Sequence, residues 1–188
     1  MALAIAGVAL VATPAAAEDG QAKTEHSVQA ETGIESWQFT DNGVGVLLMQ
    51  ISPDQARAFF IGRGFQRDDV EYYASSCVFM TLVKNQTPQP VYYRLGDWRF
   101  SRGDGIARPL KLKDEWLREW KKRGVSQSSQ IAFEWSQHPV EQMLEPGDWN
   151  QGMTTFLVPH GERFDLTVKW KIGDNIHVGT IPEVRCAK

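Results

Sequence analysis

Four side chains in one region of this sequence could hold a metal ion. His138 and Met143 flank a segment with an irregular pattern, and Met153 and His160 bracket the segment that follows. Imidazole and thioether groups are ligands that suit Cu(I) and Cu(II). An extended strand would separate Met153 from His160 by about 23 Å, which is too far for one ion. The copper hypothesis therefore uses His138, Met143 and one of the other two.

A second group of residues could bind a ligand at the surface. Asp148, Trp149 and Asn150 form an unusual polar string between Pro146-Gly147 and an apolar segment. They favour either a loop that presents a binding surface or a turn in which Trp149 covers the edge of the core. Five tryptophans fall on predicted inner faces: Trp37, Trp116, Trp120, Trp135 and Trp170. Trp98 and Trp149 remain as stacking platforms for a sugar.

Catalytic motifs are absent from the sequence. It has no nucleophile elbow, no phosphate-binding loop and no zinc-protease motif. Histidines that could serve a triad are few, with His138, His160 and His177 in the expected folded part. The sequence therefore predicts a protein without enzymatic activity.

The first residues predict export. An uncharged apolar run from Ala2 to Ala12 precedes Thr13-Pro14-Ala15-Ala16-Ala17, which ends in an Ala-x-Ala cleavage signature. We expect residues 1–17 to be a signal peptide cut after Ala17, which leaves a periplasmic or secreted chain with no transmembrane span. No Lys or Arg precedes the apolar run, and a start codon further upstream would supply one. A retained membrane anchor or an ordinary apolar helix is the alternative.

The sequence contains two cysteines, Cys77 and Cys186. Thiols persist as disulfides in oxidising compartments, and two cysteines allow one intramolecular pairing. We therefore predict a disulfide that closes a loop of slightly more than a hundred residues. Such a loop stabilises the fold by about 4 to 5 kcal/mol in the chain-entropy description.

Composition sets the domain organisation. Residues 18–33 are polar, with almost no large apolar side chain, and predict a flexible leader that includes His26. Residues 34–188 are long enough for a single well-packed domain. A net charge of −3 argues against a nucleic-acid partner.

Short strands dominate the pattern. Residues 76–83 are apolar on both faces and predict a central strand. Asp41-Asn42-Gly43 is typical of a hairpin turn between residues 36–40 and 44–51. Residues 91–95 and 98–100 predict strand pieces that break at Gly96-Asp97. Further strands are expected around Ile131, Phe133 and Trp135, then at 152–158, 163–172 and 176–184, with an irregular segment over 139–147.

Three helices interrupt the strands in this prediction. Ser52-Pro53-Asp54-Gln55 has the residues of a capping box, residues 68–74 suit a second short helix, and Leu112, Trp116 and Trp120 recur at helical spacing. The pattern as a whole predicts a mainly β fold, an antiparallel β-sandwich with two or three inserted or peripheral helices. An immunoglobulin-like arrangement is one form that fits.

Three functions agree with these observations. The first is an exported, non-catalytic accessory or interaction protein of the bacterial cell envelope, with an envelope protein as its partner. The second is a periplasmic copper-binding or copper-delivery protein that uses the Met and His ligands. The third is a carbohydrate-binding module. The sequence indicates no oligomeric state.

Overall fold

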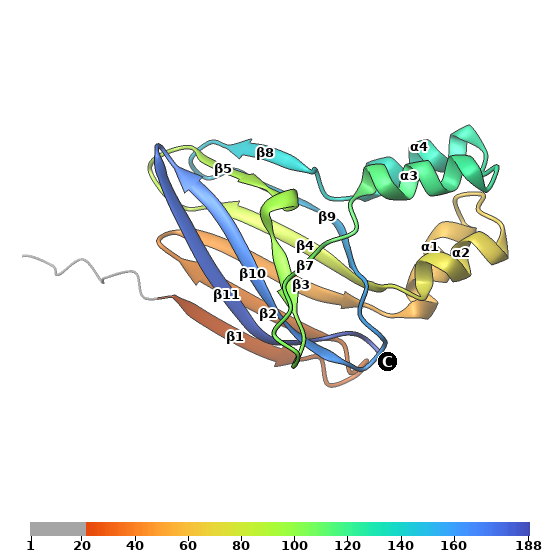
Figure 1. The fold of residues 1–188 in the computed structure, drawn as a ribbon, viewed down its shortest axis with the longest axis horizontal. Coiled ribbons are helices and arrows are strands. Elements are labelled where there is room, and N and C mark those ends of the chain that lie inside the picture. The colour runs from red at the N-terminus through yellow and green to blue at the C-terminus, as the bar shows by residue number, and fades with distance from the viewer. Residues whose placement is uncertain (1–21) are drawn as a thin grey trace, which may run out of the picture.

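The computed structural model describes residues 22–188, which form two antiparallel sheets and four α-helices (Figure 1). The sheets pack face to face, and the helices gather at one end of them. The mainly β sandwich with helices that the pattern predicted is therefore confirmed. The expected signal peptide, residues 1–17, lies outside the described residues. No helix within residues 22–188 is long and apolar enough to cross a membrane.

The first sheet, which we call sheet A, has the order β1-β2-β3-β4-β9. Its strands are β1 (Lys23–Val28), β2 (Glu35–Asp41), β3 (Val44–Ile51), β4 (Cys77–Asn85) and β9 (Trp149–Phe156). The turn between β2 and β3 has positive φ at Asn42 and Gly43, as expected of a tight hairpin. Strand β4 is an interior strand between β3 and β9, so the predicted central strand is confirmed.

The second sheet, sheet B, is built around β10 (Arg163–Ile172). One edge of β10 pairs with β11 (Asn175–Arg185), and the other pairs with β6 (Arg99–Ser101) and then β5 (Val91–Arg94). The 3₁₀ turn η1 (Leu95–Asp97) separates β5 from β6 at the expected break. Short outer strands complete the sheet, β7 (Arg108–Pro109) beside β6 and β8 (Glu141–Leu144) beside β5.

The strand order differs from that of an immunoglobulin domain. Four consecutive strands, β1 to β4, lie side by side in sheet A. In an immunoglobulin domain the second and third strands belong to different sheets. The sandwich is therefore a meander packed against a second antiparallel sheet whose strands are not consecutive in the chain.

Each half of the molecule has its own apolar core. The core between the two sheets is rich in aromatic residues, including Phe39, Phe79, Phe100, Phe156, Phe164 and Trp170. A second core lies among the helices and contains Phe60, Phe65, Tyr73, Trp116, Trp120 and Phe133. It also includes Val78 and Met153 from sheet A, so the helices rest on the outer face of that sheet at one end.

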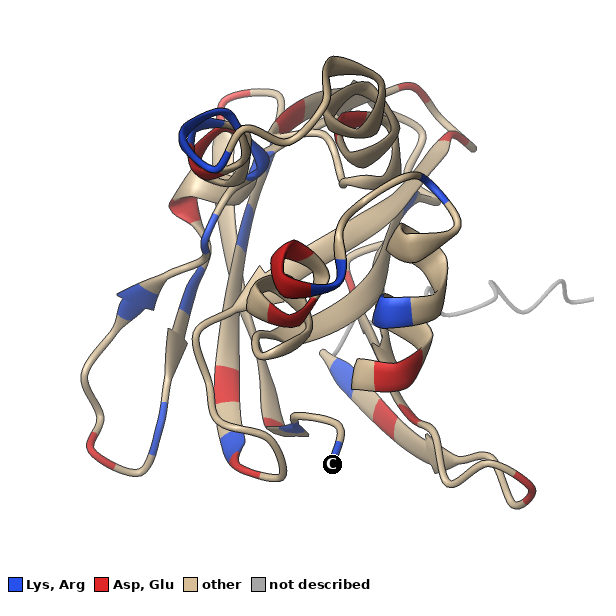
Figure 2. Ribbon diagram, turned by 90° about the vertical axis from the view of Figure 1, so that its right-hand side faces the viewer, with Lys and Arg blue, Asp and Glu red and all other residues tan. Residues whose placement is uncertain are grey.

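The helices enter as two hairpins. α1 (Pro53–Ile61) and α2 (Arg67–Ala74) lie between β3 and β4, and α3 (Lys113–Lys122) and α4 (Gln127–Ser136) lie between β7 and β8. The capping box that begins α1 is present, because Ser52 and Gln55 each accept a backbone hydrogen bond from the other. Figure 2 looks onto this end and shows Lys and Arg interspersed with Asp and Glu on the helices.

Helix α4 corrects the expectation of a strand around residues 131–135. Ser126 begins the helix, and its Oγ accepts a hydrogen bond from the Ser129 amide. Phe133 is buried in the second core, whereas Ile131 and Trp135 are 48% and 86% exposed. Three apolar residues at alternate positions are too few to distinguish a strand from a helix that buries one of them. The assignment of Trp135 to an inner face was wrong for the same reason.

Strand β1 corrects the expectation of a flexible leader for residues 23–28, whereas residues 18–21 of that leader lie outside the described residues. Backbone pairing with β2 orders residues 23–28, although their side chains are mostly exposed. His26 stacks on Trp37 with ring centroids 4.8 Å apart, and its Nε2 lies 2.9 Å from a Glu35 carboxylate oxygen. Backbone pairing and these side-chain contacts order the segment although it buries little apolar surface. Strand β8 similarly falls within residues 139–147, which were expected to be irregular.

The predicted disulfide is confirmed, since Cys77 and Cys186 are paired with their Cα atoms 5.3 Å apart. It ties the end of the chain to β4. A buried polar network lies beside it, in which Gln50 donates to the Arg185 carbonyl at 2.8 Å and Arg185 forms an ion pair with Glu35. Burial alone would raise the pKa of the Glu35 carboxyl, but hydrogen bonds from Arg185 and His26 lower it below its usual value.

Candidate functional site

The four proposed copper ligands do not lie together. Met143 is exposed on β8, opposite Tyr92, which in turn pairs with Lys171 near one end of β10. His160 lies at the other end of β10, where its Nδ1 is 3.0 Å from the Ala187 carbonyl oxygen. Lys171 lies eight residues after Arg163, the first residue of β10, and an extended strand of that length spans about 27 Å.

The other two proposed ligands are buried in different surroundings. Met153 belongs to the helical core, where its sulfur lies 3.8 Å from the Tyr73 hydroxyl. His138 packs against the Tyr93 ring of the core between the sheets. Burial lowers the pKa of His138 to about 4. Within residues 22–188, no three His, Cys, Asp or Glu side chains form a metal-binding group either.

The proposed surface site is only partly exposed. Trp98 is 1% exposed, and its indole nitrogen donates to the Lys169 carbonyl at 3.1 Å, so its placement on the surface was wrong. Asp148 forms a turn by accepting a hydrogen bond from the Glu145 amide. Trp149 is 54% exposed at the start of β9. It therefore does not cover the edge of the core, and the surface interpretation holds for this residue.

Trp149 belongs to a part of sheet A that the helices leave uncovered. Strand alternation places Val78, Met80 and Met153 on the outer face, and these pack against the helices. On the part of the outer face that lies beyond the helices, the side chains are half-buried or exposed. We call this uncovered region the open face, and its residues are Gln38, Thr40, Gly45, Leu47, Leu82, Lys84, Trp149 and Gln151.

The strand register arranges the open face in two rows across the sheet. One row runs Thr40, Gly45, Lys84 and Trp149, and the other runs Gln38, Leu47, Leu82 and Gln151. Each row crosses four strands, from β2 to β9, so it spans about 14 Å between its end Cα atoms. Apolar side chains thus form the middle of one row, and polar side chains stand at both of its ends.

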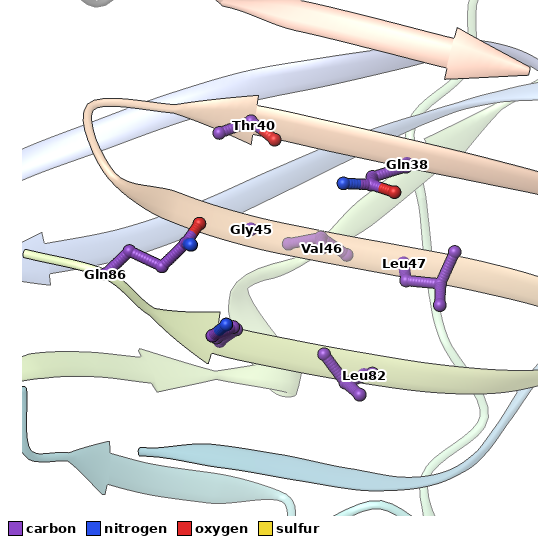
Figure 3. A pocket seen from close by; sticks show the side chains of 8 residues that line it. Gln38, Thr40, Gly45, Val46, Leu47, Leu82 and Gln86 are labelled. Atoms are coloured by element: carbon purple, nitrogen blue, oxygen red, sulfur yellow. The ribbon is translucent and has the colours of Figure 1, made fainter. Parts of the chain in front are cut away.

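A hollow of about 210 Å³ lies over Gly45 (Figure 3). Gln38, Thr40, Lys84 and Gln86 surround it, and Leu47 and Leu82 line it as well. It exists because Gly45 has no side chain between its neighbours. A Cβ atom built on Gly45 would meet nothing closer than 3.9 Å, so the space above the strand is open.

A second hollow, of about 480 Å³, lies where β9 approaches the helices. It is lined by Lys113, Glu134, Trp135, Gln137, Pro139, Asn150 and Gln151. Lys113 and Glu134 approach each other to 3.8 Å on one side of it. Gln151 lines this hollow and is the register partner of Leu82 in the first, so the two hollows adjoin.

Several polar side chains around the hollows have unused hydrogen-bonding capacity. Within residues 22–188, the side-chain amides of Gln38, Gln86, Asn150 and Gln151 and the Thr40 hydroxyl make no hydrogen bond to another protein group. Elsewhere, buried amides such as that of Asn85 are fully engaged, donating to the carbonyls of Gln89 and Leu144. The polar groups around the two hollows thus differ from those that support the fold.

Sequence reasoning found only Trp149 and Asn150 of this site. Trp135 was missed because α4 was taken for a strand. The glutamines on β2 and β9 were missed because the sequence of a strand does not show which strands it pairs with. Alternation does indicate that Gln38, Leu82 and Gln151 face away from the core, which is the signal that was available.

Comparison with models of protein families, with curated proteins and with solved structures finds no match to this chain.

Proposed function

We propose that this chain is an exported, non-catalytic binding protein of the cell envelope that holds its ligand on the open face of sheet A. The observation that carries the proposal is the set of unengaged amide side chains beside two hollows, with exposed tryptophans nearby. Such groups are hydrated in the free protein and are available for contacts with a ligand.

Exposed tryptophan supports a binding surface. Exposure of a large aromatic side chain to water is unfavourable relative to its burial. Trp is also enriched among the residues that dominate binding energy. Trp149 and Trp135 are 54% and 86% exposed, whereas Trp37, Trp98, Trp116, Trp120 and Trp170 are all buried. The two exposed rings belong to the region around β9, where the hollows adjoin.

Export is supported by the cysteine pair. Disulfides persist in oxidising compartments and are rare in the cytosol. The pairing of Cys77 with Cys186 is compatible with a periplasmic or secreted protein. A copper function gains no comparable support, because Met143 and His160 lie at opposite ends of β10. His138 and Met153 are neighbours through the backbone, but their side chains are buried in different cores.

Site-specific photocrosslinking in cells tests this proposal. A photoreactive amino acid replaces Gln151 in the open face, and in a matched strain it replaces Val178 on β11. Both are exposed strand positions, and Val178 belongs to sheet B. We expect adducts from position 151 and few from position 178. Equal yields at both positions, or none at position 151, would contradict a binding site on the open face.

A further inference from the structure

We propose that the ligand of the open face is an uncharged glycan chain that lies across the strands of sheet A. The inference rests on the proposed function, because it assigns a chemical class to the ligand of the same surface. It follows from three properties of the surface, namely the kind of its polar groups, its charge and its shape.

The polar groups are of the kind that binds sugar hydroxyls. Each hydroxyl of a sugar both donates and accepts hydrogen bonds, and a side-chain amide does the same from adjacent atoms. Gln38 and Gln86 flank the first hollow, and Asn150 and Gln151 line the second. With the Thr40 hydroxyl, these groups supply donors and acceptors together. A surface that recognised a carboxylate alone would need donors only.

Trp149 provides a flat apolar surface beside these amides. The carbon-bound hydrogens on one face of a pyranose ring form an apolar patch that packs on an indole ring. Trp149 lies at one end of the row that contains Gly45 and Lys84, next to the first hollow. Trp135 lines the second hollow, so an exposed indole is available along each part of the surface.

The charge of the surface disfavours ionic ligands. No carboxylate lines the first hollow, and Lys84 is its one cation among the described residues. In the second hollow the charge of Lys113 is offset by Glu134 at 3.8 Å. A nucleic acid or another polyanion would need several unpaired cations to neutralise its charges. A basic partner would need free carboxylates, and the nearest one on this face, Glu25 on β1 opposite Gln38, is paired with Lys23 at 2.5 Å.

The shape indicates a chain and not a single sugar. Both hollows are open to solvent along the surface, and together they extend across β2, β3, β4 and β9, about 14 Å between Cα atoms. A site for a monosaccharide would enclose most of its surface. An extended site lets a linear polymer enter and leave at both ends. We therefore expect affinity to increase with the number of sugar units until the chain spans both hollows.

Calorimetric titration of the purified mature protein tests the inference. The probes are glucose oligomers and N-acetylglucosamine oligomers, both β-1,4-linked, from the disaccharide to the hexasaccharide. We expect one of the two series to bind, with affinity rising along the series. Trp149→Ala should weaken binding about tenfold, which corresponds to about 1.4 kcal/mol and lies within the range of an aromatic stacking contact. Gln38→Ala and Gln151→Ala should each weaken it, and Val178→Ala on sheet B should leave it unchanged.

The outcomes separate the two proposals. If neither series binds, or if binding is the same in Trp149→Ala as in the unaltered protein, the glycan inference is wrong. Specific crosslinks from position 151 would then still support a binding surface with a ligand of another class. If the crosslinks are also absent, the proposed function fails together with the inference.

Discussion

Removal of the disulfide should destabilise the fold by several kcal/mol, because the linked cysteines are far apart in sequence. The separation of Cys77 and Cys186 is 109 residues. The chain-entropy relation for a loop of this length gives about 4.8 kcal/mol at 25 °C, through restriction of the unfolded chain. We therefore predict that the variant with both Cys77→Ala and Cys186→Ala loses about 4 to 5 kcal/mol of unfolding free energy.

The noncovalent contacts near Cys186 do not substitute for the stabilisation that the disulfide provides by restricting the unfolded chain. Gln50 and Glu35 hold Arg185 in the folded state of the variant as well, so they leave the entropy gained by its unfolded chain unchanged. Urea denaturation followed by tryptophan fluorescence measures the loss. With an m-value of about 2.5 kcal/mol/M, the midpoint should fall by about 2 M.

Reductant provides the control for that experiment. The unaltered protein unfolded in reductant should approach the midpoint of the double variant, and the variant itself should not respond to reductant. A loss of less than about 1 kcal/mol would refute the reasoning, since it is well below the range that such loops give. The unfolded chain around Cys186 would then be restricted even without the disulfide.

Two further predictions concern the contact between β9 and residues 137–138, which lie alongside it. A Cβ atom on Gly152 would collide with the backbone of Gln137 and His138, so Gly152→Ala should lower stability by about 1 to 3 kcal/mol or more in thermal unfolding, whereas Gly45→Ala should leave it nearly unchanged. Burial lowers the pKa of His138 from 6.5 to about 4, so the unfolded chain gains a proton between these values that the folded protein does not. The unfolding free energy should therefore fall by roughly 3 kcal/mol as the pH drops from 6.5 to 4. Urea denaturation at several pH values measures this change, and the unfolding free energy of His138→Phe should depend less on pH.

The pattern of the sequence predicted elements whose signals are local. Capping residues marked α1, alternation marked β10, a turn marked the return strand β11, and the apolar faces of β4 marked an interior strand. It failed where the signal was weak or distant. The helix that carries Trp135 depends on an N-cap at Ser126, and β1 is ordered by β2 and not by its own composition.

The candidate site depends on contacts that no local pattern contains. Gln151 and Leu82 are adjacent because β9 pairs with β4, although helices and sheet B strands intervene in the chain. The extent of the open face is set by how far the helices cover sheet A. Trp98 shows the converse error, because it is buried in the core between the sheets, where its indole nitrogen donates to a carbonyl of β10. Sequence reasoning therefore found exposed positions on β9 and could not assemble the surface around them.

Filling the hollow over Gly45 tests the central claim most directly. Gly45→Val adds a side chain that suits a strand, in a space where the nearest atoms to its Cβ are the Lys84 Cβ and the Phe39 carbonyl oxygen, both 3.9 Å away. We predict an unchanged or slightly raised unfolding temperature and a loss of most crosslinked adducts from position 151. A folded Gly45→Val protein that gives the same adducts in the same yield would contradict a binding site on the open face.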